Sequence, residues 1–178
     1  NSINARQRDT CIINGIRMDL TFENLLNDRI YINWAVIHAK QGQNISSTTP
    51  DFFRSYGSER SFNADASATV TGLSYSVAQI NTDEFLVLKR GKFMLTPAAT
   101  LAGDVPPRGY NYGAATKEIK CWMKVGRQFY FDDGSAEPQD QLTFVCWASN
   151  PSDGTGTVAS AFRYRLRAIC YWREPRGG

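Results

Sequence analysis

The sequence has little histidine and no closely spaced cysteines. His38 is the only histidine, and Cys11, Cys121, Cys146 and Cys170 are far apart, with no Cys-x-x-Cys pair. A zinc site would need ligands at shorter spacing, and a double-stranded β-helix metalloenzyme needs two or three histidines beside a carboxylate. We therefore predict no metal site, no cofactor and no enzymatic activity. We expect the four thiols to be free and structural, although two disulfides remain an open alternative.

Long hydrophobic runs are also missing. No segment approaches the roughly 18 to 20 consecutive apolar residues that a membrane span requires, and residues 1–6 do not form the apolar part of a signal peptide. We therefore expect a soluble domain without a membrane span. The first methionine is Met18, so we expect that a further N-terminal segment precedes the sequence or that the initiator was removed.

Length and charge set further bounds. The chain has 178 residues, 42% of them hydrophobic, which is enough for one domain with a sizeable core. A net charge of +3 is too small to indicate polyanion binding by itself. The position of the bases matters more, because they fall in strand-like runs while acids such as Asp132, Asp133 and Asp153 fall in loop-like segments.

Alternating hydrophobicity predicts β-strands along most of the chain. The expected strands are residues 12–23, with Ile12, Asn14, Ile16, Met18, Leu20 and Phe22 on one face, and residues 30–37, 85–96, 119–125, 142–148 and 161–173. Residues 30–37 are apolar on both faces, as in a buried central strand, and Gly91 is expected to form a turn or bulge. A short helix is expected from Thr49, with Phe52 and Phe53 on its apolar side. With residues 85–96 taken as two strand halves on either side of Gly91, the pattern along the chain gives seven or eight strands, which favours a two-sheet antiparallel sandwich or barrel.

Two of these strands carry basic rows. Arg163, Arg165 and Arg167 share one face of the last strand. The opposite face, which is expected to lie in the core, consists of Tyr164, Leu166, Ala168, Cys170 and Trp172. In the strand at 119–125, Lys120, Trp122 and Lys124 share a face, so an aromatic ring lies between two ammonium groups. Guanidinium groups suit phosphate, and rings suit stacking on bases, so these rows predict a single-strand binding surface. The alternative is a solvated face, a face against neighbouring acids, or an edge strand whose charges prevent aggregation.

The order of these strands resembles that of a known family. The relevant segments are Cys11 to Arg17, the strand containing Trp34, Thr49 to Phe53, Asp83 to Arg90, Lys117 to Val125 and the terminal strand Arg163 to Trp172. From Thr10 to Trp172 they are similar to the coat proteins of small circular single-stranded DNA viruses, chiefly those of the geminivirus and genomovirus kind. The resemblance implies an all-β, single-domain, eight-stranded antiparallel jelly-roll sandwich at residues 10–175, with one or two short helices in loops. The family's basic N-terminal arm is missing here, and residues 1–9 are expected to be its remnant.

The expected function is therefore that of a structural capsid protein. It would form a homo-oligomeric icosahedral shell in the virion, assembled in the host nucleus, and would package single-stranded nucleic acid, most simply DNA, without a small-molecule substrate. The expected nucleic-acid-binding residues are Arg6, Arg8, Lys120, Trp122, Lys124, Arg163, Arg165 and Arg167. Residues 41–51, 97–113 and 132–141 are expected to form subunit contacts. The alternative is a carbohydrate-binding, lectin-like β-sandwich that uses Tyr110, Tyr112 and Trp122.

Overall fold

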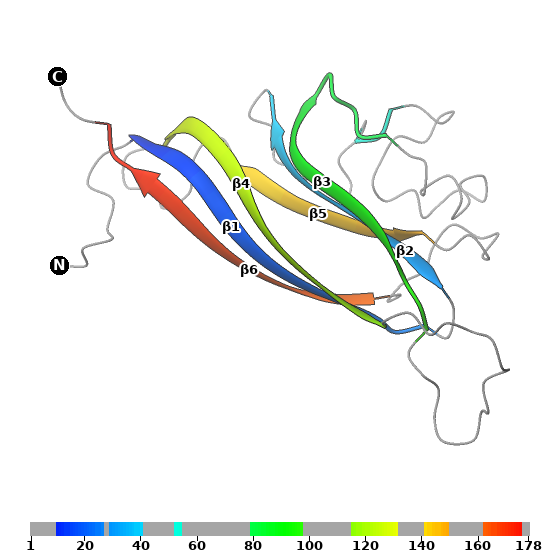
Figure 1. The fold of residues 1–178 in the computed structure, drawn as a ribbon. Helices are drawn as coiled ribbons and strands as arrows, with labels where there is room; N and C mark the ends of the chain where they lie inside the picture. Colours follow the sequence, from blue (N-terminus) through cyan, green and yellow to red (C-terminus); the bar gives the residue numbers. More distant parts are fainter. Residues whose placement is uncertain are drawn as a thin grey trace, which may run out of the picture.

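Two antiparallel β-sheets make up the part of the chain that the computed structural model describes, namely residues 10–26, 29–40, 52–54, 79–97, 115–131, 141–149 and 162–175. The strands are β1 (Thr10–Asn24), β2 (Ile30–Ala39), β3 (Phe85–Leu95), β4 (Thr116–Tyr130), β5 (Leu142–Ser149) and β6 (Phe162–Arg173). Sheet A has the order β4-β1-β6, and sheet B has the order β3-β2-β5 (Figure 1). The predicted all-β fold with two antiparallel sheets is confirmed, with six strands in place of eight among these residues. In the same ranges no helix has the length and apolar character to cross a membrane.

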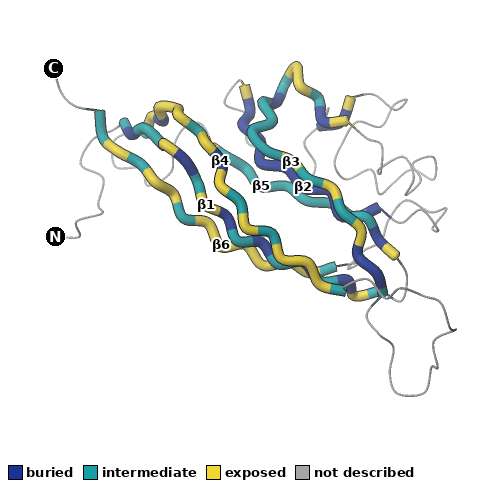
Figure 2. The backbone as a smooth tube through the Cα atoms, in the orientation of Figure 1, coloured by how far each residue is buried: buried dark blue, intermediate teal, exposed yellow. Residues whose placement is uncertain are grey.

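Strand β2 is the buried centre of sheet B, as its two apolar faces predict. One face packs against sheet A, and the main core cluster there contains Ile30, Ile32 and Trp34 together with Met18 and Leu20 of β1. The other face forms a second cluster, which consists of Ala35, Ile37, Ala39, Phe52, Phe53, Ile80 and Phe85. Figure 2 shows the resulting contrast between a dark β2 and the more exposed outer strands. Sheet B is therefore covered on both sides.

A β-bulge changes the alternation along β1. The pairing with β4 shifts between Ile13 and Gly15, where β4 carries one residue more than β1. Gly126 of β4 lies in this extra stretch and has a φ of 63°, a left-handed conformation that suits glycine. The expected core position of Asn14 is therefore wrong: Asn14 is exposed, and Cys11 is buried in its place. Against β6 it is β1 that carries the extra residue, Asn14, because Ile13 pairs with Trp172 and Gly15 with Tyr171. An added residue turns the side chains beyond it to the other face of the sheet.

Gly91 forms neither a turn nor the bulge of its strand. Strand β3 passes through it without interruption, and the register shift of β3 against β2 lies instead between Val36 and Ile37, opposite Leu88. Gly91 pairs with Trp34, and a Cβ atom at position 91 would lie 2.4 Å from Trp34 Nε1. The glycine is needed because the indole of Trp34 occupies the space where a side chain would be.

The expected helix is wrong where it can be checked, and its first residues, 49–51, lie outside the described residues. Phe53 forms an antiparallel bridge with Ile80, and the Arg54 amide donates to the Gln79 carbonyl at 2.7 Å. Phe52 and Phe53 are both buried and in edge-to-face contact, with ring centroids 4.7 Å apart. Pairing with a distant segment outweighed the local start signal of the proline, so these rings cover sheet B from an extended backbone.

The last strand has the expected two faces, but its apolar face is only partly covered. Leu166 pairs with Leu20 of β1, so its side chain is on the core side of the sheet. Leu166 is nevertheless 39% exposed and Tyr164 is 47% exposed. Strand β6 is an edge of sheet A, and it meets sheet B at Tyr164, whose ring centroid is 5.6 Å from that of Phe144. Alternation predicted which side each residue takes, and the edge position limited the burial.

Replacing Gly91 with alanine tests the close approach of Trp34. We expect the Gly91→Ala variant to lose about 1 to 3 kcal/mol of unfolding free energy, because the new methyl group must displace a buried ring. Chemical denaturation of the single and double variants measures this loss. Combining Gly91→Ala with Trp34→Phe should cost clearly less than the sum of the two single changes, and additive costs would contradict the contact.

Candidate nucleic-acid interface

The side of sheet A that faces away from sheet B, here called the outer face, is defined by the pairing register. Met18, Leu20 and Phe22 of β1 are buried in the core, so the residues between them point the other way. Their partners on both neighbouring strands share that side. The outer face contains Gly15, Arg17, Asp19, Thr21 and Glu23 of β1, Thr116, Glu118, Lys120, Trp122 and Lys124 of β4, and Arg163, Arg165, Arg167, Ile169, Tyr171 and Arg173 of β6.

Both predicted basic rows lie on this one face. Lys120, Trp122 and Lys124 come from β4, on one side of β1, and Arg163, Arg165 and Arg167 come from β6, on the other. All six side chains are exposed. Arg6 and Arg8 lie outside the described residues. The structure thus brings together two rows that the sequence placed on separate strands.

Glu23 and Arg163 form a charged pair at one end of the face. Arg163 Nε donates a hydrogen bond to Glu23 Oε2, and the same two groups form an ion pair. This hydrogen bond holds the pKa of Glu23 below its ordinary value, with further contributions from the charges of Arg163 and Arg165. The same bond raises the pKa of Arg163. Because Arg163 is exposed and Glu23 is only partly buried, the effect of this pair on folding stability is small.

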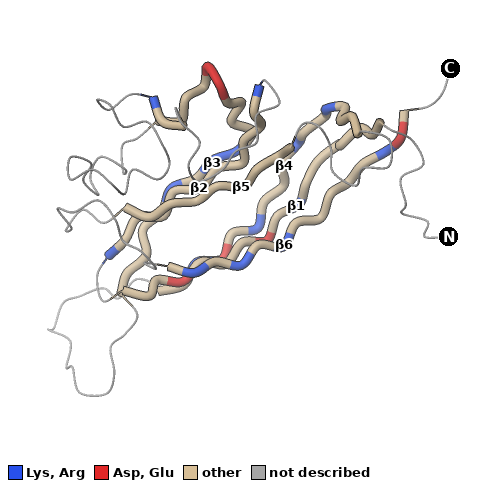
Figure 3. The backbone as a smooth tube through the Cα atoms, turned by 180° about the vertical axis from the view of Figure 1, so that it is seen from behind, with Lys and Arg blue, Asp and Glu red and all other residues tan. Residues whose placement is uncertain are grey.

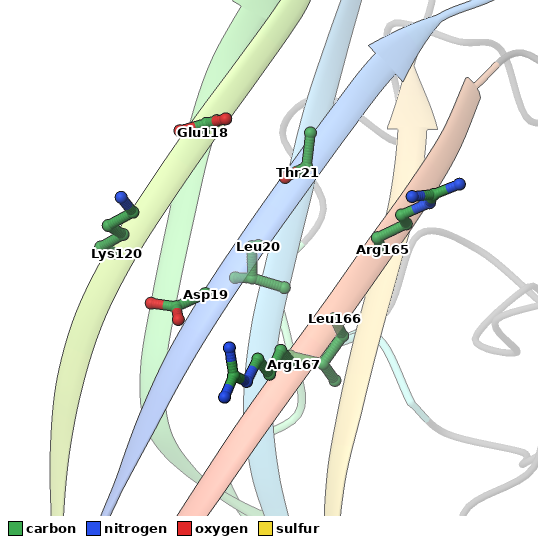
Figure 4. A pocket seen from close by; sticks show the side chains of 8 residues that line it. All are labelled: Asp19, Leu20, Thr21, Glu118, Lys120, Arg165, Leu166 and Arg167. Atoms are coloured by element: carbon green, nitrogen blue, oxygen red, sulfur yellow. The ribbon is translucent and has the colours of Figure 1, made fainter.

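Asp19 is the centre of a second set of charges. Lys120 and Arg167 are its direct neighbours on β4 and β6, and Arg17 Nε is 3.6 Å from its Oδ1. Two residues further along β1, Thr21 lies between Glu118 and Arg165. A shallow open hollow of about 540 Å³ lies here, shown close up in Figure 4, where Arg167 reaches from β6 towards β1. It is lined by Asp19, Leu20, Thr21, Glu118, Lys120, Arg165, Leu166 and Arg167. Figure 3 shows acidic segments beside basic ones along these strands.

The other end of the face has an exposed aromatic pair. Trp122 is 50% exposed and Tyr171 is 46% exposed. Their ring centroids are 5.2 Å apart with an interplanar angle of 62°, which is an edge-to-face contact across β1. Gly15 lies between them, paired with Tyr171 and diagonal to Trp122. A Cβ atom at Gly15 would lie 2.2 Å from Trp122 Cζ2, so the indole rests directly on the glycine backbone.

Sequence reasoning missed several members of this face. Tyr171 has the same parity as Arg163, so the alternation that placed the arginines also carried a signal for this ring. Asp19 and Glu23 were expected on the polar face of the first strand, without partners, and Glu118 was not assigned to a face. Which basic side chains lie next to these acids depends on the register between strands that are far apart in the sequence. A local sequence pattern does not reveal this register.

The cysteines and the single histidine lie on the strands of the two sheets. All four cysteines are free, as expected, with Cys11 buried and Cys170 exposed. Burial raises the pKa of the Cys146 thiol to about 12, which disfavours its thiolate at neutral pH. His38 is buried near the end of β2, with its ring centroid 6.1 Å from that of Phe129. Within the described ranges, no group of three or more His, Cys, Asp or Glu side chains could hold a metal ion.

The Glu23–Arg163 pair predicts a specific titration. Since the folded-state pKa of Glu23 is lowered, the stabilisation from this carboxylate is present above its ordinary pKa and is lost as the pH falls through the lowered value. We expect Arg163→Gln to raise the pKa of Glu23, measured by NMR of the carboxyl carbon. Arg167→Gln is the control, because Arg167 is not among the groups that lower this pKa. Equal titration curves for wild type and Arg163→Gln would contradict the pairing.

Comparison with known proteins adds no family to these observations. No protein-family model matches the chain, and no curated protein matches it significantly.

Proposed function

We propose that this protein is a viral capsid subunit with no catalytic role, which self-assembles into an icosahedral shell around single-stranded DNA. The observation that carries this proposal is the outer face of sheet A, where Lys120, Trp122 and Lys124 lie across β1 from Arg163 and its neighbours. Basic side chains beside exposed aromatic rings are typical of a surface that binds single-stranded nucleic acid, because the charges pair with phosphates and the rings stack on nucleobases. The resemblance to coat proteins of small circular single-stranded DNA viruses supports the same function.

The finer fold in this proposal is the eight-stranded jelly roll. The first strand pairs with the last and the second with the last but one, so β1–β6 and β2–β5 form nested pairs in different sheets. A chain folded back on itself in this way, as two packed sheets, is consistent with a jelly roll. A rigid two-sheet block suits a shell, because identical subunits meet through the same surfaces throughout a symmetric assembly.

In the proposed mechanism the outer face of sheet A is turned towards the packaged strand. Lysine and arginine side chains replace the counterions of the phosphates, which makes binding independent of sequence and sensitive to salt. Arg6 and Arg8, in the arm remnant at residues 1–9, would add to this neutralisation. The protein would act in the virion and in the host nucleus during assembly.

A lectin-like module is the second candidate, because the exposed rings of Trp122 and Tyr171 could also stack on a sugar. The bases around these rings favour a polyanion over a neutral glycan. Oligomeric mass separates the two functions: a lectin would be a monomer or small oligomer, whereas a coat protein forms particles of megadalton size.

Purification of the full chain tests assembly. We expect particles of megadalton mass in analytical ultracentrifugation and closed shells in negative-stain images, with an absorbance ratio that indicates nuclease-protected nucleic acid. Raising the ionic strength should weaken the binding of added single strands, with a linear fall of log affinity against log salt. Monomers alone at physiological salt, with the full N-terminus present, would contradict the capsid function, and specific glycan binding by those monomers would favour the lectin.

A further inference from the structure

Trp122 is held in place by three contacts from three different strands. Its ring rests on Gly15 of β1 and touches the edge of Tyr171 on β6. Its backbone carbonyl accepts a hydrogen bond of 2.8 Å from Lys89 Nζ of β3. An exposed ring that is already fixed loses little conformational entropy when a ligand stacks on it. The half-exposed indole is therefore a preformed platform.

The basic side chains nearest this platform have few acidic neighbours. Lys124 and Tyr171 are the direct neighbours of Gly15, Arg17 is the direct neighbour of Trp122, and Arg173 follows on β6. We call this part, with Trp122 itself, the aromatic end of the outer face. Among the outer-face positions described for it there is no acidic side chain, but Arg17 at its border forms an ion pair with Asp19 of the adjoining part, at 3.6 Å. At Lys124 and Arg173 a phosphate therefore meets positive charge with no carboxylate among their direct cross-strand neighbours.

The remainder of the outer face is different. It carries three acidic side chains among its basic ones, and we call it the charge-paired end. Its charged members are Asp19, Glu23, Glu118, Lys120, Arg163, Arg165 and Arg167. Arg163 is bonded to Glu23, and the charge of Arg165 also acts on Glu23. A polyanion lying here would have to displace these carboxylates or approach them closely, and either change costs free energy.

We propose that single-stranded nucleic acid is bound at the aromatic end, with nucleobases stacked on Trp122 and Tyr171 and phosphates on Lys124 and Arg173. Arg163 and Arg165 serve mainly to pair with the acidic side chains of sheet A, although they belong to the basic row that the sequence pattern shows most clearly. This inference rests on the proposed function and narrows the outer face to one end of it. The two ends differ in composition while sharing the same sheet, so they supply matched variants.

Fluorescence anisotropy with the full chain and a labelled oligothymidylate of about ten nucleotides tests the location. Trp122→Ala should weaken binding by about tenfold, and Trp122→Phe should restore part of the loss, because stacking needs a ring. Circular dichroism and thermal melting check that each variant is folded. The readout is the ratio of affinities to wild type at one fixed salt concentration.

Two double variants of equal charge provide a second measurement that does not depend on the tryptophan. Lys124→Gln with Arg173→Gln should weaken binding strongly and make its salt dependence shallower by roughly one unit of log–log slope. Arg163→Gln with Arg165→Gln removes the same charge from the charge-paired end and should change affinity less than about threefold.

Equal losses from the two double variants, or an unchanged affinity in Trp122→Ala, would overturn the assignment to the aromatic end. Either result with intact, nucleic-acid-filled particles would leave the capsid function standing. Failure of the wild type to bind the oligonucleotide at low salt would overturn this assignment together with nucleic-acid packaging. A lack of particles with normal oligonucleotide binding would count against the shell alone.

Discussion

The register of β1 against its two neighbours is the constraint on which the rest of sheet A depends. Strand β1 is central, so its residues from Gly15 to Glu23 each have a defined partner on β4 and on β6. Burying Met18 and Leu20 in the core forces Arg17 and Asp19 to the outer face. A slip of one residue would bury these charges and expose the core residues, which is far too costly to be populated. The outer face is therefore a consequence of the core.

A glycine that lies against a tryptophan ring of a neighbouring strand occurs in both sheets. Inside, Gly91 admits the ring of Trp34, and outside, Gly15 admits the ring of Trp122. In both cases the missing side chain lets a large ring lie against the backbone of a neighbouring strand. The interior contact contributes to packing, while the exterior contact fixes an exposed ring. The contact between a glycine and a tryptophan ring thus stabilises the fold in sheet B. In our proposal, the same kind of contact in sheet A supports the binding of nucleic acid.

Much of the fold could be predicted from period-two patterning, because alternation reports which side of a strand is buried. It correctly placed the core side of β4, with Met123, and the continuous burial of β2. It could not place the bulge opposite Asn14 or the bridge at Phe53, because both arise from pairing with segments far away in the sequence. It also could not tell that β6 is an edge strand, so Leu166 was expected to be buried.

The candidate site was predictable to the same extent. Alternation placed Lys120, Trp122 and Lys124 on one face and Arg163 with its neighbours on another, but only the three-dimensional register joined these faces. The acids that divide the face in two, such as Glu23, have no signal of their own in the sequence. Their effect depends on cross-strand neighbours within about 5 Å, and the packing of the two sheets decides which strands those are.

Ultraviolet cross-linking of nucleic acid in purified particles, followed by mass spectrometry of the cross-linked peptides, tests the central claim most directly. The claim is that the outer face of sheet A lies against the packaged strand, where stacked aromatic rings are in contact with bases. The account predicts cross-links at Trp122 or Tyr171, on strands β4 and β6. Cross-links confined to other segments, with both of these rings unmodified in nucleic-acid-filled particles, would contradict it.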